Sequence, residues 1–249
     1  MAAEPEFEVR LAKDAADLRA AQRLRYQVFV EELGGGGEMV DHGARLERDR
    51  FDAHSDHMIL WDGDRAVGVY RLMRADHAAS AGGFYTEAEY DLAPLKASGR
   101  SLLELGRSCL LPDYRGGAAM YHLWTGLAGY VAEHGIEILF GVASFHGTDA
   151  EALKGSLSLL AQRHLAPEAL RVRSRAYQEM NLVPQEALDR RAAMLQVPAL
   201  IKAYLRLGGM VGEGAYVDHA FNTVDVFLMM DTARMNAQRA RIYAQEGRV

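Results

Sequence analysis

Residues 101–143 read SLLELGRSCLLPDYRGGAAMYHLWTGLAGYVAEHGIEILFGVA and contain a strand, a helix and a second strand in succession. The first strand covers residues 101–111 and stops at a proline, and the helix covers residues 118–134 and stops at Gly135. The second strand, residues 136–143, is apolar throughout, which is typical of the middle of a sheet. A strand–helix–strand unit predicts an α/β fold.

Before this unit, the sequence predicts further strands and one helix. They are a strand at residues 7–12, a helix capped by Asp14 that runs to about residue 33, and a hairpin of residues 57–61 and 65–74 joined by Asp62-Gly63-Asp64. The stretches between them predict loops: four glycines at residues 34–37, a charged segment at residues 38–56, and small residues at 78–83.

After this unit, Thr148 and Glu151 are spaced as a capping box for a helix to His164. The last third then predicts a helix at residues 198–207, a turn rich in glycine, a strand at residues 223–230 and a final helix at residues 232–246. The glycines of that turn are Gly208, Gly209, Gly212 and Gly214. The order predicts a mixed central sheet with helices on both faces, formed by a core of residues 1–165 and a C-terminal extension of residues 166–249.

Composition narrows the class of protein. The chain has 249 residues and a net charge of −6, which disfavours a nucleic-acid partner. One cysteine excludes an intramolecular disulfide, and the acidic N-terminus is not a signal peptide, so a cytoplasmic location is expected. No apolar run is long enough to span a bilayer, so any membrane contact is expected to be peripheral, through Arg234, Arg239 and Arg241 of the last helix.

A buried strand that carries Glu104 and Arg107 is the first candidate for chemistry. A central strand tolerates such charges only when they are paired or face a cavity. Alternation places Glu104 on one face and Arg107 on the other, and Gly106 between them is a candidate bulge that opens the strand toward a ligand. A structural salt bridge explains the two charges equally well. Cys109 is followed by two leucines, which indicates a buried, inert thiol.

Carboxylates at positions 47, 49 and 52 form a second candidate site. They are placed to hold Arg25 and Arg71, to bind a cationic amine, or to bind a metal with His42, His54 and His57. The metal hypothesis is the weakest, because these histidines lie at a strand entrance instead of one turn apart on a helix. The chain also lacks the Gly-x-Ser-x-Gly motif of an esterase serine.

These motifs together resemble a known family. The motifs are Arg25-x-x-x-Phe29, Glu47-x-Asp49-x-Phe51-Asp52, Gly68-x-Tyr70-Arg71-Leu72 and Glu104-Leu105-Gly106-Arg107-Ser108. The pattern resembles the GNAT-fold branch that contains acyl-homoserine-lactone synthases. With residues 84–92, 139–149 and 198–209 added, it resembles still more the ornithine N-acyltransferases of bacterial ornithine-lipid synthesis.

The resemblance implies an enzyme that transfers a 3-hydroxyacyl group from acyl carrier protein to the α-amine of ornithine, without a metal or redox cofactor. It implies catalytic roles for Glu104 and Arg107. The implied substrate-binding residues are Arg25, Phe29, Asp49, Asp52, Arg71 and Ser108. Glu104 is the expected base, and an acyl tunnel is expected to be lined by Trp124, Phe140 and Phe145, although ordinary core packing explains each of these aromatic residues as well.

The loop Arg115-Gly116-Gly117 matches only part of the pyrophosphate motif of GNAT enzymes that use acetyl-CoA. That departure favours a carrier-protein phosphopantetheine over CoA as the donor. Three alternatives stay open at this stage: an acyl-homoserine-lactone synthase that uses S-adenosylmethionine, a metal-dependent hydrolase, and a noncatalytic binder of lipid or acyl carrier protein.

Overall fold

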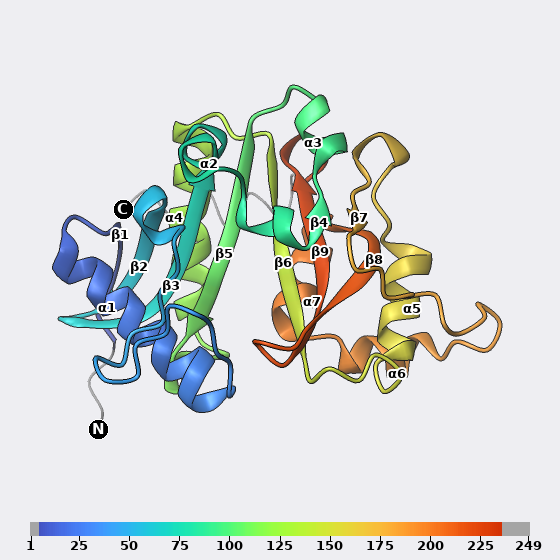
Figure 1. The fold of residues 1–249 in the computed structure, drawn as a ribbon, viewed down its shortest axis with the longest axis horizontal. Coiled ribbons are helices and arrows are strands. Elements are labelled where there is room, and N and C mark those ends of the chain that lie inside the picture. Colours follow the sequence, from blue (N-terminus) through green and yellow to red (C-terminus); the bar gives the residue numbers. More distant parts are fainter. Residues whose placement is uncertain (1–4, 236–249) are drawn as a thin grey trace. The chain divides into compact units, whose positions relative to one another are not determined.

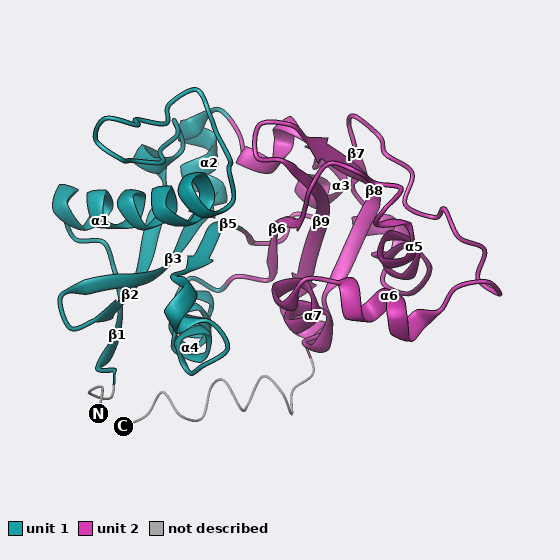
Figure 2. Cartoon of the chain, turned by 90° about the horizontal axis from the view of Figure 1, so that it is seen from below, with its two compact units in different colours: residues 1–82, 105–135, 240–249 teal, residues 83–104, 136–239 magenta. Residues whose placement is uncertain are grey.

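The computed structural model describes residues 5–235, which divide into two compact units (Figures 1 and 2). Among these residues, unit 1 contains 5–82 and 105–135, and unit 2 contains 83–104 and 136–235. The strand that carries both Glu104 and Arg107 therefore contributes to both units. The predicted boundary after residue 165 lies inside unit 2.

Unit 1 is a sheet covered on both faces. Its strands are β1 (Phe7–Leu11), β2 (Asp56–Asp62), β3 (Arg65–Arg74) and the second half of β5 (Leu102–Leu110), in that spatial order. Helix α1 (Ala15–Arg25) and helix α4 (Ala119–Glu133) pack on opposite faces of these strands, as Figure 2 shows. Apolar residues of α4 form the core on its side, among them Leu123, Leu127 and Tyr130, as predicted.

Two local predictions in unit 1 are confirmed. The Asp14 carboxylate accepts hydrogen bonds from the amides of Ala16 and Asp17 and so caps α1. In the β2–β3 hairpin, Asp62 lies opposite Arg65, and Gly63 has a positive φ of 54°, as a two-residue turn requires. The helix after Asp14 also extends close to residue 33, but after Arg25 it changes to a π-helix, Tyr26–Glu32. Such segments often occur at functional sites.

Two glycines on α4 differ sharply in their surroundings. A Cβ atom at Gly126 would lie 2.6 Å from Cγ1 of Val9 on β1, whereas a Cβ at Gly129 would meet nothing within 4 Å. We expect Gly129→Ala to raise the free energy of unfolding by about 0.5–1 kcal/mol through helix propensity. Gly126→Ala gains the same propensity but overpacks the α4–β1 contact, so it should lower the unfolding free energy by about 1–3 kcal/mol. Urea unfolding of both variants measures the difference, and equal values would contradict this packing.

Unit 2 is a sheet with both parallel and antiparallel pairs. Its strands follow the spatial order β5, β6 (Ile138–His146), β9 (Thr223–Asp231), β8 (Met210–Asp218), β7 (Arg173–Ser174) and β4 (Tyr90–Asp91). Its α-helices are α3 (Ala93–Ala97), α5 (Lys154–Arg163), α6 (Arg190–Gln196) and α7 (Ala199–Arg206). Strand β6 runs parallel to β5 over Leu102–Glu104 and antiparallel to β9 along its whole length. The apolar segment predicted as a central strand therefore has neighbours on both sides.

Three predictions about local structure were wrong. Residues 78–83 do not form a loop, because the alanine-rich stretch forms helix α2 (Ala75–Ala81), which ends at Gly82 in the left-handed conformation. Gly212 and Gly214 lie in β8 instead of a turn, where a register irregularity occurs between Val211 and Ala215. A Cβ at either glycine would lie within 3 Å of a neighbouring side chain, so close packing explains both.

The third wrong prediction is the capping box at Thr148 and Glu151. The Asp149 carboxylate instead accepts hydrogen bonds from the amides of Glu151 and Ala152, and α5 begins only at Lys154. The final helix predicted for residues 232–246 lies largely outside the described residues. Within them, Thr232–Arg234 forms one 3-10 turn. None of the helices in residues 5–235 is long and apolar enough to cross a membrane.

Candidate active site

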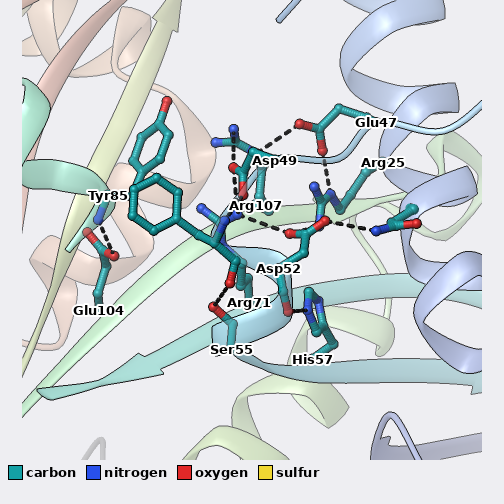
Figure 3. Close-up of polar contacts among 12 residues, drawn as sticks. Arg25, Glu47, Asp49, Asp52, Ser55, His57, Arg71, Tyr85, Glu104 and Arg107 are labelled. Carbon is teal, nitrogen blue, oxygen red and sulfur yellow. Dashed lines mark hydrogen bonds and ion pairs between the residues drawn. The ribbon is translucent and has the colours of Figure 1, made fainter. Parts of the chain in front are cut away.

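Three arginines and three carboxylates of unit 1 form one connected ionic network (Figure 3). Its members come from α1 (Arg25), from the segment before β2 (Glu47, Asp49 and Asp52), from β3 (Arg71) and from β5 (Arg107). We call these six residues the ionic network. Five of them were predicted as site residues, and the sixth, Glu47, was predicted as part of the same acidic cluster.

Arg25 lies at the centre of the ionic network. Its side chain is 0% exposed, Nε donates to the Glu47 carboxylate, and Nη1 donates to Oδ1 of Asp52 at 2.8 Å. Gln22, one turn earlier on α1, donates from Nε2 to the other oxygen of Asp52 at 3.0 Å. Burial by itself would lower the pKa of Arg25, but the opposing charges of Glu47 and Asp52 raise it overall, so the guanidinium stays charged.

Asp49 joins the two remaining arginines. Nη1 of Arg71 lies 2.6 Å from each Asp49 oxygen, and Nη2 of Arg107 donates to Oδ2 of Asp49 at 2.9 Å. Arg107 also donates from Nε to Glu47 at 3.2 Å. Arg107 has a positive φ of 51°, so the departure from regular strand geometry occurs one residue after the predicted bulge at Gly106. The ion pairs hold Arg107 in a backbone conformation that a non-glycine residue rarely adopts.

This geometry assigns the acidic segment a structural role in unit 1. Asp49 and Asp52 were candidates either to bind an ammonium group or to hold arginines, and in the structure both are engaged by arginine guanidiniums. The most accessible members are Asp49, 18% exposed, and Arg107, 11% exposed. A substrate that contacts the ionic network would therefore meet these two residues first.

The ionic network makes a prediction about acid stability. Burial raises the pKa of Asp49, but Arg71 and Arg107 lower it more, so the folded-state pKa lies below the unfolded value of about 3.9. The stabilisation from Asp49 is then fully present above about pH 5 and is lost as the pH falls toward the folded pKa. We expect the difference in unfolding free energy between wild type and Asp49→Asn to stay constant from about pH 7 to pH 5 and to shrink below about pH 4. Urea unfolding across this range measures it, and a difference that grows toward acid would contradict the assignment.

The histidines that suggested a metal site make other contacts. Nε2 of His57 donates to the carbonyl oxygen of Asp52 at 3.0 Å, and burial lowers the pKa of His57. Nδ1 of His42 lies 2.9 Å from the Tyr26 hydroxyl. Within the described residues, the side chains close enough together to share a metal ion are three carboxylates of unit 2, Glu89, Asp218 and Asp225. They lie outside residues 42–57, which prompted the metal hypothesis.

Glu104 belongs to unit 2 and anchors a loop. Its side chain is buried, and its two oxygens accept hydrogen bonds from the backbone amides of Tyr85 (3.0 Å) and Thr86 (2.7 Å) (Figure 3). Hydrogen bonds from amides to both oxygens fix the carboxylate in one orientation and hold the backbone at Tyr85 and Thr86. Sequence reasoning missed these two amides, although they lie in the segment 84–92 that carried part of the family resemblance.

The aromatic residues predicted to line a tunnel are packed in cores. Trp124, in unit 1, donates from Nε1 to the Tyr70 hydroxyl at 3.2 Å. Phe140, in unit 2, packs edge-on against Phe84 with 5.0 Å between ring centroids. Phe145 is buried on the same strand as Phe140, but an odd spacing of five residues puts the two on opposite faces of β6. These two rings therefore cannot line the same side of the sheet.

The remaining candidates are more accessible. Phe29 and Ser108 are half-buried, on the π-helix and on β5 respectively. Both terminal nitrogens of Arg115 bind Glu32, at 2.6 and 2.7 Å, and Gly116 has a positive φ of 76°. Helix α4 begins just after this loop, and its N-cap residue, Ala118, offers no side-chain acceptor to the first-turn amides.

Cys109 is buried, and burial raises the pKa of its thiol, as expected for an inert cysteine.

Comparison with known proteins agrees with this fold and chemistry. A family model described as an acetyltransferase (GNAT) domain matches residues 24–125. The chain is 60% identical to the L-ornithine N(alpha)-acyltransferase of Rhodobacter capsulatus over 258 residues, covering 100% of both chains. It is 41% identical to the L-ornithine N(alpha)-acyltransferase of Brucella abortus, covering 96% of this chain and 89% of that one.

Solved structures support the fold alone. FeeM, an N-acyl amino acid synthase from uncultured soil microbes, has a TM-score of 0.56 at 12% identity, covering 94% of this chain and 96% of its own. BjaI, a CoA-dependent acyl-homoserine lactone synthase, has a TM-score of 0.56 at 14% identity, covering 98% of this chain and 89% of its own. The predicted GNAT-like mixed α/β fold is confirmed.

Proposed function

Because the chain belongs to the family of the L-ornithine N(alpha)-acyltransferases, we propose that it forms an amide between a fatty acyl group and the α-amine of L-ornithine. The observation that carries this proposal is the 60% identity to a protein of that name over the full length of both chains. The product is a lyso-ornithine lipid, which a second acyl transfer to its hydroxyl group would complete.

The reaction needs a neutral amine, a base and a polarised thioester. The α-nitrogen attacks the thioester carbonyl carbon, the C–S bond breaks, the donor leaves as a thiol, and the nitrogen loses a proton. We assign Glu104 to accept that proton, directly or through water, because it is a buried carboxylate that two backbone amides fix in one orientation. We assign Arg107 and Asp49, the most accessible members of the ionic network, to contact the substrate.

The donor is proposed to be a 3-hydroxyacyl chain on the phosphopantetheine of acyl carrier protein. The Arg115 side chain is occupied by Glu32, so the backbone of Gly116 and Gly117 and the start of α4 are better placed than Arg115 to hold a phosphate. Each buried CH₂ of the acyl chain adds about 0.8 kcal/mol, so chain burial supplies much of the affinity. The enzyme is proposed to act in the cytoplasm and to release its lipid product at the membrane surface.

Product analysis tests this function. Purified protein is incubated with 3-hydroxyacyl carrier protein, or with the matching acyl-CoA, and a panel of amino acids that includes ornithine, lysine and S-adenosylmethionine. Mass spectrometry should find N-acyl-ornithine with the carrier-protein donor. If product forms only with acyl-CoA, the donor is CoA and not acyl carrier protein. If a lactone forms from S-adenosylmethionine, the proposed acceptor is wrong.

A further inference from the structure

Unit 2 contains a second acidic cluster that the mechanism above does not use. One carboxylate oxygen from each of Glu89, Asp218 and Asp225 lies within 4.8 Å of the others. Glu89 is 4% exposed and Asp225 is 3% exposed, whereas Asp218 is half-buried. The pKa of the neighbouring Tyr216 is raised, first by burial and then by all three carboxylates. The cluster is therefore a local concentration of negative charge with restricted access to water.

Strand register puts a buried hydroxyl beside these carboxylates. Thr223 and Asp225 are two residues apart on β9 and share one face of the sheet, and Thr223 lies directly opposite Asp218 on β8. The Thr223 side chain is 9% exposed, and its Oγ1 has no hydrogen-bond partner among the described residues. Burying a hydroxyl without a hydrogen-bond partner is unfavourable, so this atom indicates a polar ligand at the cluster.

The same face is open at one end. Ser144 of β6 lies opposite Asp225, and His146 lies opposite Thr223, and both of these β6 residues are exposed. In the other direction along the face, Phe140 and Phe227 stack with 5.9 Å between their ring centroids. Asp225 is therefore level with an exposed position of β6, and it lies two residues along β9 from the apolar Phe227.

We propose that Glu89, Asp218 and Asp225 bind the side-chain ammonium group of the amino-acid acceptor. This inference rests on the proposed function, because ornithine differs from norvaline only by that ammonium group. The carboxylates of the ionic network bind arginines of unit 1. The cluster is a separate group of three carboxylates in unit 2, the unit that also contains Glu104. Recognition of the ammonium would make the site specific for diamino acids.

The oxygen separations are compatible with an ammonium group. An ammonium that donates three hydrogen bonds of about 2.8 Å places its acceptors roughly 4.6 Å apart, and the three oxygens lie within 4.8 Å of one another. Calcium and magnesium need about six to eight oxygen ligands, and the hydroxyls of Thr223 and Tyr216 are weaker ligands for them than carboxylates or carbonyls.

The test compares ornithine with norvaline as acceptors. Asp218→Asn is the main variant, because Asp218 is the most accessible of the three residues, and Asp225→Asn is the second. We expect each to raise the KM for ornithine at least about tenfold, since each removes a charge-assisted hydrogen bond. The KM for norvaline and for the acyl donor should stay unchanged. Glu186→Gln, which neutralises an exposed carboxylate of unit 2, is the matched control and should change none of these values.

Calorimetric titration of both amino acids onto the same proteins separates the two proposals. If wild type makes no N-acyl-ornithine, the proposed function fails, yet ornithine binding that Asp218→Asn weakens would still support the ammonium site. Unchanged preference for ornithine over norvaline in the folded variants would overturn the inference. Tight binding of magnesium or calcium to wild type, lost in Asp218→Asn, would also overturn it.

Discussion

Replacing Arg25 with methionine should lower the free energy of unfolding by about 3–5 kcal/mol, because two buried carboxylates each lose one of their two arginine partners. Glu47 and Asp52 are 1% and 5% exposed, and both bind the Arg25 guanidinium directly. Arg25→Lys keeps the charge but lacks the planar guanidinium whose separate nitrogens reach Glu47 and Asp52, so we expect an intermediate loss. Urea unfolding monitored by circular dichroism measures all three proteins.

Arg48→Met is the matched control for this prediction. Arg48 pairs with Asp41 at 3.4 Å, and its side chain is 44% exposed, so the loss should stay below about 1 kcal/mol. An Arg25→Met protein as stable as Arg48→Met would show that the buried network does not require its central charge. If Arg25→Met fails to fold, the unfolding free energies of Arg25→Lys and Arg48→Met are compared instead.

Glu104→Gln should lower kcat at least about 100-fold while the protein stays folded. The carboxylate accepts an amide hydrogen bond on each oxygen, whereas glutamine has one acceptor oxygen and would turn an NH₂ group toward the other amide. The change therefore removes the proposed base and loosens the loop at Tyr85 and Thr86. Steady-state kinetics with saturating donor measure kcat, and full turnover by folded Glu104→Gln would refute both roles.

The pH profile separates the base from the loop anchor. If Glu104 takes the proton, the variant should lose the part of the fall of kcat/KM toward acid pH that comes from protonation of the enzyme, and keep only the part that comes from protonation of the substrate amine. If Glu104 only positions the loop, the profile keeps its shape at a lower rate. Glu87→Gln is the matched control, because Glu87 accepts a hydrogen bond from the Phe84 amide in the same segment at 3.0 Å. Its kcat should stay within about threefold of wild type, since a neutral acceptor can replace the bond to Phe84 and the other partner of Glu87, Lys96, is an exposed ion pair.

Much of the fold followed from local patterns. The hairpin around Gly63, the cap at Asp14 and the apolar strand β6 depend on neighbouring residues, and all three were predicted. The wrong predictions concern positions where the local sequence allows two structures and tertiary packing selects one of them. Asp149 and Thr148 are both good caps, and the chain uses Asp149. Gly212 and Gly214 signal a turn by composition, whereas in β8 they allow side chains from other segments to approach the backbone.

The candidate site was predictable in its residues but only partly in their pairing. Carboxylates at positions 47, 49 and 52 were expected to hold Arg25 and Arg71, and the structure pairs them so. Arg107, a candidate on a separate strand, binds two of the same carboxylates. Which carboxylate meets which arginine depends on long-range packing that alternation along a strand cannot supply. The cluster of Glu89, Asp218 and Asp225 combines segments more than 120 residues apart, so no local spacing indicated it.

The interleaved order of the two units has a consequence for synthesis on the ribosome. Unit 1 takes its last strand and helix α4 from residues 105–135, after residues 83–104 have entered unit 2. When residue 82 emerges, Arg25, Glu47 and Asp52 have been made, but Arg107 and the helix that covers β1–β3 have not. We therefore expect the nascent chain to expose one apolar sheet face and an incomplete set of charges until residue 135 has left the tunnel, and to need protection from aggregation during that interval.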